Sequence, residues 1–127
     1  MHHAIETSKA PAPIGPYSQA VRAGNSLFVS GQIALNPDSG ELEIDNLERE
    51  THRVLTNLKS ILTAAGGELK HVVKCSIFLS DMNDFAAVNE IYAEYFNTDT
   101  PPARECVQVS VLPKNVNVEI SAIAVLD

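Results

Sequence analysis

The sequence predicts an α+β fold in which a mixed β-sheet carries two helices on one face. Two segments with helical periodicity alternate with segments of strand periodicity, in the order β-rich, α, β, α, β, β. The chain has 127 residues, of which 45% are hydrophobic and 20% charged, and it contains no compositionally biased tract. This length and composition fit a single domain over residues 1–127 with its own core.

Residues 27–35 are the first segment predicted to form a strand. They follow an Ala-, Pro- and Gly-rich stretch over residues 5–21, which predicts an extended arm or loop because its prolines lack a backbone donor. Gly31 interrupts the middle of the strand, and such a glycine usually marks a bulge or a close approach by another group. The turn-forming residues 36–40 then end the strand.

Two later segments are predicted to be helices. In residues 45–65 apolar side chains recur at helical spacing, Asp45 or Asn46 can cap the first turn, and a Gly-Gly pair follows. A second helix is predicted over about residues 83–96, before the prolines at 101–102 that prevent its continuation.

Three further segments have strand periodicity. Residues 71–79 alternate between two sets of side chains, and two last strands are predicted over residues 104–111 and 116–126. The turn-like residues 112–115 join these last two strands. Together with residues 27–35 they complete a mixed sheet with both helices on one side.

The second face of this predicted sheet is not plainly charged. One side collects a normal apolar core: Leu27, Val29, Ile33, Val73, Cys75, Ile77, Val107, Val109, Val111, Val118, Ile120 and Ala122. The other side collects Phe28, Ser30, Ala34, Ser76, Phe78, Arg104, Cys106, Gln108, Ser110, Glu119, Ser121, Ile123 and Val125. A surface of this second kind is typical of one covered by another subunit, so we expect a homo-oligomer. The alternative is a partly hydrated sheet face in a monomer.

Composition and charge argue against several classes of protein. The net charge of −7 and the isoelectric point near 5.0 would repel a phosphate backbone, so no nucleic-acid partner is expected. The apolar stretches have strand length, well short of the ~20 residues of a membrane helix. Because no secretory signal pattern is present, we expect a cytoplasmic protein in which Cys75 and Cys106 are free thiols.

Arg104 is the first candidate for chemistry. Strand alternation aims Arg104 and Cys106 at one side and Glu105 at the other. The planar guanidinium matches a carboxylate, which favours substrate recognition; an interface salt bridge is an equally good explanation from the residues alone. Glu119, expected on the same side, either acts as a general base or simply neutralises Arg104.

Other chemistries have less support. A neighbouring cation would favour a Cys106 thiolate nucleophile, yet no histidine has sequence support as its base. The histidine and cysteine spacings match no zinc pattern, so no metal site is expected. Tyr17, after Gly15-Pro16, can place a phenol at a pocket rim, although tyrosines in such loops also simply pack.

Eight short segments, taken in order, are similar to the motifs of one protein family. They are APIGPYSQA (12–20), SGQI (30–33), DMNDF (81–85), VN (88–89), PARECVQV (102–109), LPK (112–114), VEI (118–120) and AIAV (122–125). This ordered set, which spans essentially the whole chain, resembles the Rid family of reactive intermediate deaminases, also called the YjgF/UK114 family.

The resemblance implies a fold similar to Bacillus-type chorismate mutase, assembled as a homotrimer with sites between subunits. It implies hydrolysis of 2-aminoacrylate and of 2-imino acids such as 2-iminopropanoate and 2-iminobutanoate to 2-keto acids and ammonia, without a cofactor. By position, Arg104 would hold the substrate carboxylate and Glu119 would place the attacking water. The pocket would be lined by Gly31 and Cys106 through backbone groups, and by Tyr17, Ser30 and Asn89, partly from the neighbouring subunit.

The chain departs from the family pattern at three positions. Glu105 stands where Ser or Thr is usual, Ser121 where a second Glu is common, and Val111 where Arg is frequent. Glu105 is expected to point away from Arg104 and to leave the anion site intact. Two rival functions remain: a trimeric small-carboxylate-binding or regulatory protein, and a ribonuclease or translation inhibitor, against which the acidic charge argues.

Overall fold

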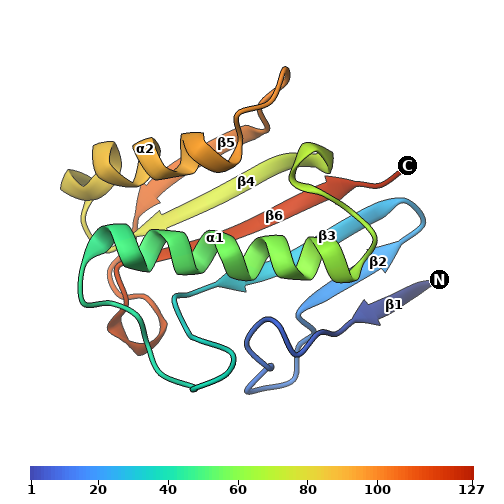
Figure 1. The fold of residues 1–127 in the computed structure, drawn as a ribbon, viewed down its shortest axis with the longest axis horizontal. Coiled ribbons are helices and arrows are strands. Elements are labelled where there is room, and N and C mark those ends of the chain that lie inside the picture. Colours follow the sequence, from blue (N-terminus) through green and yellow to red (C-terminus); the bar gives the residue numbers. More distant parts are fainter.

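The computed structural model describes residues 1–127 as a six-stranded mixed sheet with two helices on one face (Figure 1). The strands are β1 (His2–Ile5), β2 (Ala20–Ala23), β3 (Ser26–Gln32), β4 (Val72–Leu79), β5 (Ala103–Gln108) and β6 (Val118–Val125); the helices are α1 (Leu47–Ala64) and α2 (Phe85–Tyr95). Three short 3₁₀ turns cover Leu69–His71, Met82–Asp84 and Pro113–Asn115. The strand order is β1-β2-β3-β6-β4-β5, and only β4 and β5 pair in parallel. The predicted α+β class is confirmed.

Local sequence signals determine where α1 begins and ends. The Asn46 side chain accepts a hydrogen bond from the Arg49 backbone N–H at 2.8 Å, which caps the first turn. After the helix, Gly66 adopts a φ of +83°, a conformation that favours glycine and lets the chain leave the helix. The apolar face of α1 packs on the sheet, and Val54, Leu55 and Leu58 are fully buried. No helix has both the length and the apolar character needed to cross a membrane.

The N-terminal region is more ordered than its composition predicts. The sequence predicts a loop over residues 5–21, and the structure places β1 and β2 at the edge of the sheet, paired antiparallel with each other. The buried Gln19 side chain holds the intervening loop, because its Nε2 donates to three backbone carbonyls and its Oε1 accepts from the Thr7 N–H at 2.8 Å. A single buried amide therefore replaces the regular hydrogen bonds that the prolines forbid.

The buried side chain of Glu50 fixes the start of β6. Its carboxylate accepts hydrogen bonds from the Asn117 backbone N–H and side-chain amide, both at 2.7 Å, and from the Val118 N–H at 3.1 Å. Glu50 is fully buried in α1, so this contact ties the helix to the strand. This contact therefore also fixes the backbone position of the neighbouring Glu119.

The predicted facing of the β5 residues is wrong. Cys75 pairs with Arg104 and Ile77 with Cys106, so Arg104, Cys106 and Gln108 lie on the helix side of the sheet. Val107, predicted for the core, lies on the open side and is 43% exposed. Both faces of the sheet are apolar, and hydrophobic alternation does not tell which apolar face is the inner one.

Three other residues also depart from the predicted facing. Ala34, predicted for the second face, is fully buried, whereas Val73 and Val111, both predicted for the core, are 46% and 69% exposed. Val109, Ser110 and Val111 lie beyond the end of β5. Gly31 was predicted to mark a bulge or a close approach by another group. The register shift between Val29 and Gln32 confirms the bulge, and it reverses the alternation that follows.

Apart from these residues, the sheet face that points away from the helices is, as predicted, not plainly charged. Its register-matched rows include Phe28 opposite Ile123 and Phe78 opposite Glu119, and Phe28 and Val125 are 48% and 47% exposed. We call this surface the open face; it comprises Phe28, Lys74, Ser76, Phe78, Glu105, Val107, Glu119, Ser121, Ile123 and Val125.

Candidate active site

One group of predicted site residues gathers around Arg104, at the β5 edge of the sheet beneath α2 (Figure 1). The Arg104 Nη1 donates to the Asn89 Oδ1 at 2.6 Å. Its Cζ lies 4.9 Å from the centre of the Tyr92 ring and 5.6 Å from that of Phe85. The side chain is exposed and forms no ion pair within the chain, so its positive charge is available to an anion.

Cys106 lies two residues further along β5 on the same side as Arg104, as predicted, and is half-buried. Burial raises the pKa of the Cys106 thiol, and the opposing effect of the Arg104 charge is smaller. A thiol with a raised pKa is mostly protonated at neutral pH and is a weak nucleophile. The electrostatics therefore favour a lining role for Cys106.

A second group gathers around Glu119, in a surface hollow of ≈ 370 Å³. The hollow is lined by Ile14, Tyr17, Ser30, Gly31, Ile33, Pro113, Lys114 and Glu119. The Ser30 hydroxyl donates to the Ser18 carbonyl at 2.6 Å, which anchors the loop that carries Tyr17. Tyr17 is 52% exposed, so its ring forms part of the rim.

Gly31 allows the Glu119 carboxylate to occupy this hollow. A Cβ atom at position 31 would overlap the Glu119 carboxylate. Burial raises the pKa of the Glu119 carboxyl above its usual range. A carboxylate with a raised pKa is a stronger base, which suits proton transfer near neutral pH.

The two groups are separate within one chain, contrary to the prediction that Glu119 faces the same way as Arg104. Arg104 is in register with Cys75 on the helix side, whereas Glu119 is in register with Phe78 on the open face. The strand β4 lies between them. With strands ~4.8 Å apart and residues ~3.3 Å apart along a strand, their backbones are ~14 Å apart and their side chains point to opposite faces.

Glu105 points away from Arg104, as predicted. It lies on the open face, where the Lys74 Nζ is 3.0 Å from its carboxylate and the Ser76 hydroxyl donates to it. These contacts, the Ser76 hydrogen bond first, lower the pKa of the Glu105 carboxyl. Ser121 is in register with Ser76, so Glu105 and Ser121, two of the three positions that depart from the family pattern, belong to one row across β5, β4 and β6.

Sequence reasoning did not select four residues of these two groups as site residues. The sequence predicts Phe85 and Tyr92 as part of a helix, and Phe85 also as part of the DMNDF motif, but it assigns neither a role at the site, although both lie against Arg104. Lys114 and Ile14 line the Glu119 hollow from loops. Their proximity depends on tertiary packing, and neither periodicity nor local motif chemistry carries a signal for it.

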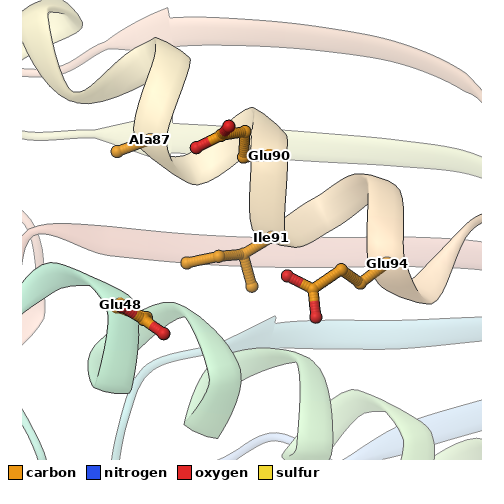
Figure 2. A pocket seen from close by; sticks show the side chains of 5 residues that line it. All are labelled: Glu48, Ala87, Glu90, Ile91 and Glu94. Carbon is orange, nitrogen blue, oxygen red and sulfur yellow. The ribbon is translucent and has the colours of Figure 1, made fainter.

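Another hollow, of ≈ 350 Å³, lies between α1 and α2 (Figure 2). Three carboxylates line it, Glu48 from α1 and Glu90 and Glu94 from α2, and Ile91 points from α2 toward α1. Three like charges would repel an anionic substrate. These side chains do not form a group arranged to hold a metal ion.

Comparison with known proteins identifies relatives along the whole chain. A family model described as endoribonuclease L-PSP matches residues 7–126. A RutC family protein from Pyrococcus horikoshii is 53% identical over 124 residues, which cover 98% of each chain. A 2-iminobutanoate/2-iminopropanoate deaminase from Mus musculus is 50% identical over 121 residues, which cover 95% of this chain and 89% of the relative.

Solved structures share the fold as well. The crystal structure of E. coli TdcF with bound serine matches with a TM-score of 0.94 and 43% identity, covering 98% of this chain and 99% of that one. The motifs, the fold and these relatives agree. The chain belongs to the Rid family, which is also described as the endoribonuclease L-PSP or YjgF family.

Proposed function

We propose that this protein hydrolyses short 2-imino acids and their enamine forms, such as 2-aminoacrylate, 2-iminopropanoate and 2-iminobutanoate, to 2-keto acids and ammonia. The observation that carries the proposal is that one chain of this family presents a guanidinium without an ion pair, Arg104, and a desolvated carboxylate, Glu119, at two separate surfaces. Two relatives support it: the mouse protein is named a deaminase of this class, and TdcF has been solved with a small amino acid bound.

In the proposed mechanism, Arg104 holds the substrate carboxylate through its planar fork. Glu119 accepts a proton from a water molecule as the water oxygen adds to the imine carbon. Glu119 returns this proton to the nitrogen of the tetrahedral adduct. The adduct hydroxyl then gives up its own proton, which passes to the nitrogen as the C–N bond breaks, and ammonia and the 2-keto acid leave. The imine is already electrophilic, so orientation and one base suffice, without a covalent intermediate or a cofactor.

The remaining residues predicted for the site belong to its two halves, one around Arg104 and one around Glu119. In the proposal Asn89 and Cys106 flank the carboxylate end of the substrate, while Tyr17, Ser30 and Gly31 surround the carbon that is attacked. These assignments are consistent with the lining of the Glu119 hollow and with the hydrogen bond between Arg104 and Asn89.

We further propose that each site is shared between two subunits of a homotrimer. A 2-imino acid has its carboxylate carbon bonded directly to its imine carbon, so it cannot reach from Arg104 to Glu119 of one chain over ~14 Å. A head-to-tail interface that brings the β5 edge of one subunit against the Glu119 hollow of the next would unite the halves and would close as a ring. The apolar open face supports such an assembly.

Mixing two inactive variants tests the shared site. Arg104→Ala removes one half and Glu119→Gln removes the other, so a mixed oligomer contains some interfaces at which both halves are intact. After co-refolding in equal amounts, about a quarter of the sites are expected to be complete and a similar fraction of wild-type turnover should return. Light scattering should give a trimer for each protein. Absence of recovered activity in verified mixed trimers would contradict the shared site.

Replacing the thiol tests the lining role of Cys106. Cys106→Ser is expected to retain most activity, because the mechanism uses the position for backbone and packing contacts and burial disfavours the thiolate. Steady-state kinetics of Cys106→Ser and Cys106→Ala would check this. Loss of turnover in both variants, with the trimer intact, would instead indicate nucleophilic catalysis.

The direct test of the function is a coupled assay. A pyridoxal phosphate enzyme that releases 2-aminoacrylate is combined with detection of the keto acid, with and without this protein. We expect keto-acid release to accelerate well above the spontaneous rate. No acceleration for any short 2-imino acid, together with retained binding of 2-keto acids, would support the small-carboxylate-binding alternative.

A further inference from the structure

Three side chains on one face of α2 surround the Arg104 guanidinium. Phe85, Asn89 and Tyr92 are spaced i, i+4 and i+7, so they lie on the same face of the helix, one above the other. The α2 helix lies over the β4–β5 side of the sheet (Figure 1). The contacts of Phe85 and Tyr92 with the Arg104 guanidinium show that this helix face is turned toward it. We call these three residues the α2 cradle.

Each member of the α2 cradle makes a different contact. The Tyr92 and Phe85 ring centres lie 4.9 and 5.6 Å from the Arg104 Cζ, within the range of an attractive cation–π interaction. The Asn89 Oδ1 accepts from Nη1 at 2.6 Å. The Arg104 side chain is thus held at two points by rings and at one by an oriented amide.

Neighbouring buried side chains hold Tyr92 in place. It is only 6% exposed, its ring packs on that of Phe96 with centroids 4.6 Å apart, and its side chain lies against the fully buried Cys75 of β4. Burial raises the pKa of the Tyr92 phenol, so the ring stays neutral and serves as an aromatic surface. A closely packed ring keeps its orientation toward the guanidinium better than a mobile ring does.

We propose that Phe85 and Tyr92 are positioning residues that hold the Arg104 fork, with Asn89, in the orientation that receives the substrate carboxylate. The proposal deepens the proposed function, on which its ligand-binding part rests. Because Nη1 donates to Asn89, the edge formed by Nε and Nη2 is left for a bidentate contact. Arginine on an exposed edge strand would otherwise lose considerable side-chain entropy on binding, and the α2 cradle reduces this loss before the ligand arrives.

The first measurement needs no ligand. In arginine-labelled wild-type protein the NMR signals of the Arg104 side chain should be shifted by the ring currents of Phe85 and Tyr92; Arg104→Lys identifies them. Phe85→Leu and Tyr92→Leu should each move these signals toward the values of an exposed arginine, whereas Tyr92→Phe should not. Unshifted Arg104 signals in the wild-type protein would overturn the proposal.

The second measurement is pyruvate binding. Phe85→Leu and Tyr92→Leu should each weaken it roughly three- to tenfold, since one cation–π contact is lost, while Tyr92→Phe should bind nearly as wild type. The matched control is Tyr95→Leu, an aromatic residue of the same helix that contacts His52 instead of Arg104. It should leave both the Arg104 signals and pyruvate binding unchanged.

Repeating both substitutions in an Arg104→Ala background separates positioning from general structure. A residue that acts through Arg104 should have no further effect there, whereas a merely structural residue lowers affinity equally in both backgrounds. Equal effects would overturn the proposal. If wild type binds no pyruvate while Phe85→Leu still shifts the Arg104 signals, the α2 cradle is supported and the proposed function fails.

Discussion

Arg104→Ala is expected to lower kcat/KM for short 2-imino acids by roughly 30-fold to several thousand-fold. The substitution removes the cation assigned to the substrate carboxylate. In the proposed site a second subunit covers this pair, and truncating one partner of a buried charge pair costs about 2–5 kcal/mol, at about 1.4 kcal/mol per factor of ten. Arg104→Lys should recover only part of this, because an ammonium lacks the planar fork and cannot bond Asn89 and the substrate in the same geometry. Steady-state kinetics and pyruvate titration would measure both effects.

A matched control removes the same charge elsewhere. Arg49 on α1 is exposed, pairs with Glu43 and Asp45 and lies in neither half of the candidate site. Arg49→Ala should leave kcat/KM unchanged within about twofold, since surface ion pairs contribute little. An Arg104→Ala variant with nearly normal kinetics would show that the carboxylate is held elsewhere, with Lys114 as the first alternative because it lines the Glu119 hollow.

Most of the fold could be predicted from the sequence because its signals are local. The periodic apolar residues of α1, its Asn46 cap and the glycine at position 66 specify that helix almost to the residue. The strands β1 and β2 were missed because they are short and lie beside a proline-rich loop. Their stability depends on the Gln19 hydrogen bonds and on pairing with β3, which are tertiary effects.

The facing of β5 was predicted wrongly because its apolar Val107 points to the open face, while the polar Arg104 and Gln108 point to the helix side. Val107 looks like a core residue by composition, yet parallel pairing with β4 places it on the open face. The same register places Arg104 under α2, away from Glu119. Alternation alone makes Arg104 and Glu119 neighbours on one surface, whereas the sheet separates them and leaves each with a different set of partners.

Candidate site residues are easier to select from the sequence than their arrangement in space. Arg104, Glu119 and Gly31 stand out by charge or by the need for space at one position. The aromatic rings around Arg104 carry no comparable signal, because Phe85 and Tyr92 fit an ordinary buried helix face equally well.

Glu119→Gln should lower turnover about 10²-fold or more while pyruvate binding is retained. The amide keeps nearly the same shape but cannot accept a proton from water, and general-base catalysis contributes about 10²–10⁴-fold. Binding survives because the carboxylate of the ligand is held by Arg104. A binding protein without catalysis would give the same retained affinity but no wild-type turnover to lose.

The pH dependence distinguishes a lost base from a damaged fold. Burial raises the pKa of Glu119, so the wild-type rate should fall as the pH is lowered through a pKa above the usual range of a glutamate. This limb of the pH–rate profile should vanish in Glu119→Gln.

The free energy of unfolding should depend on pH in the opposite direction to the rate. A raised pKa means that the folded state binds this proton more tightly than the unfolded state, so the contribution of Glu119 to stability falls as the pH rises through that window. At neutral pH Glu119→Gln should therefore melt at or above the wild-type temperature although it is nearly inactive. A variant that loses turnover and melts at a lower temperature would assign Glu119 a structural role.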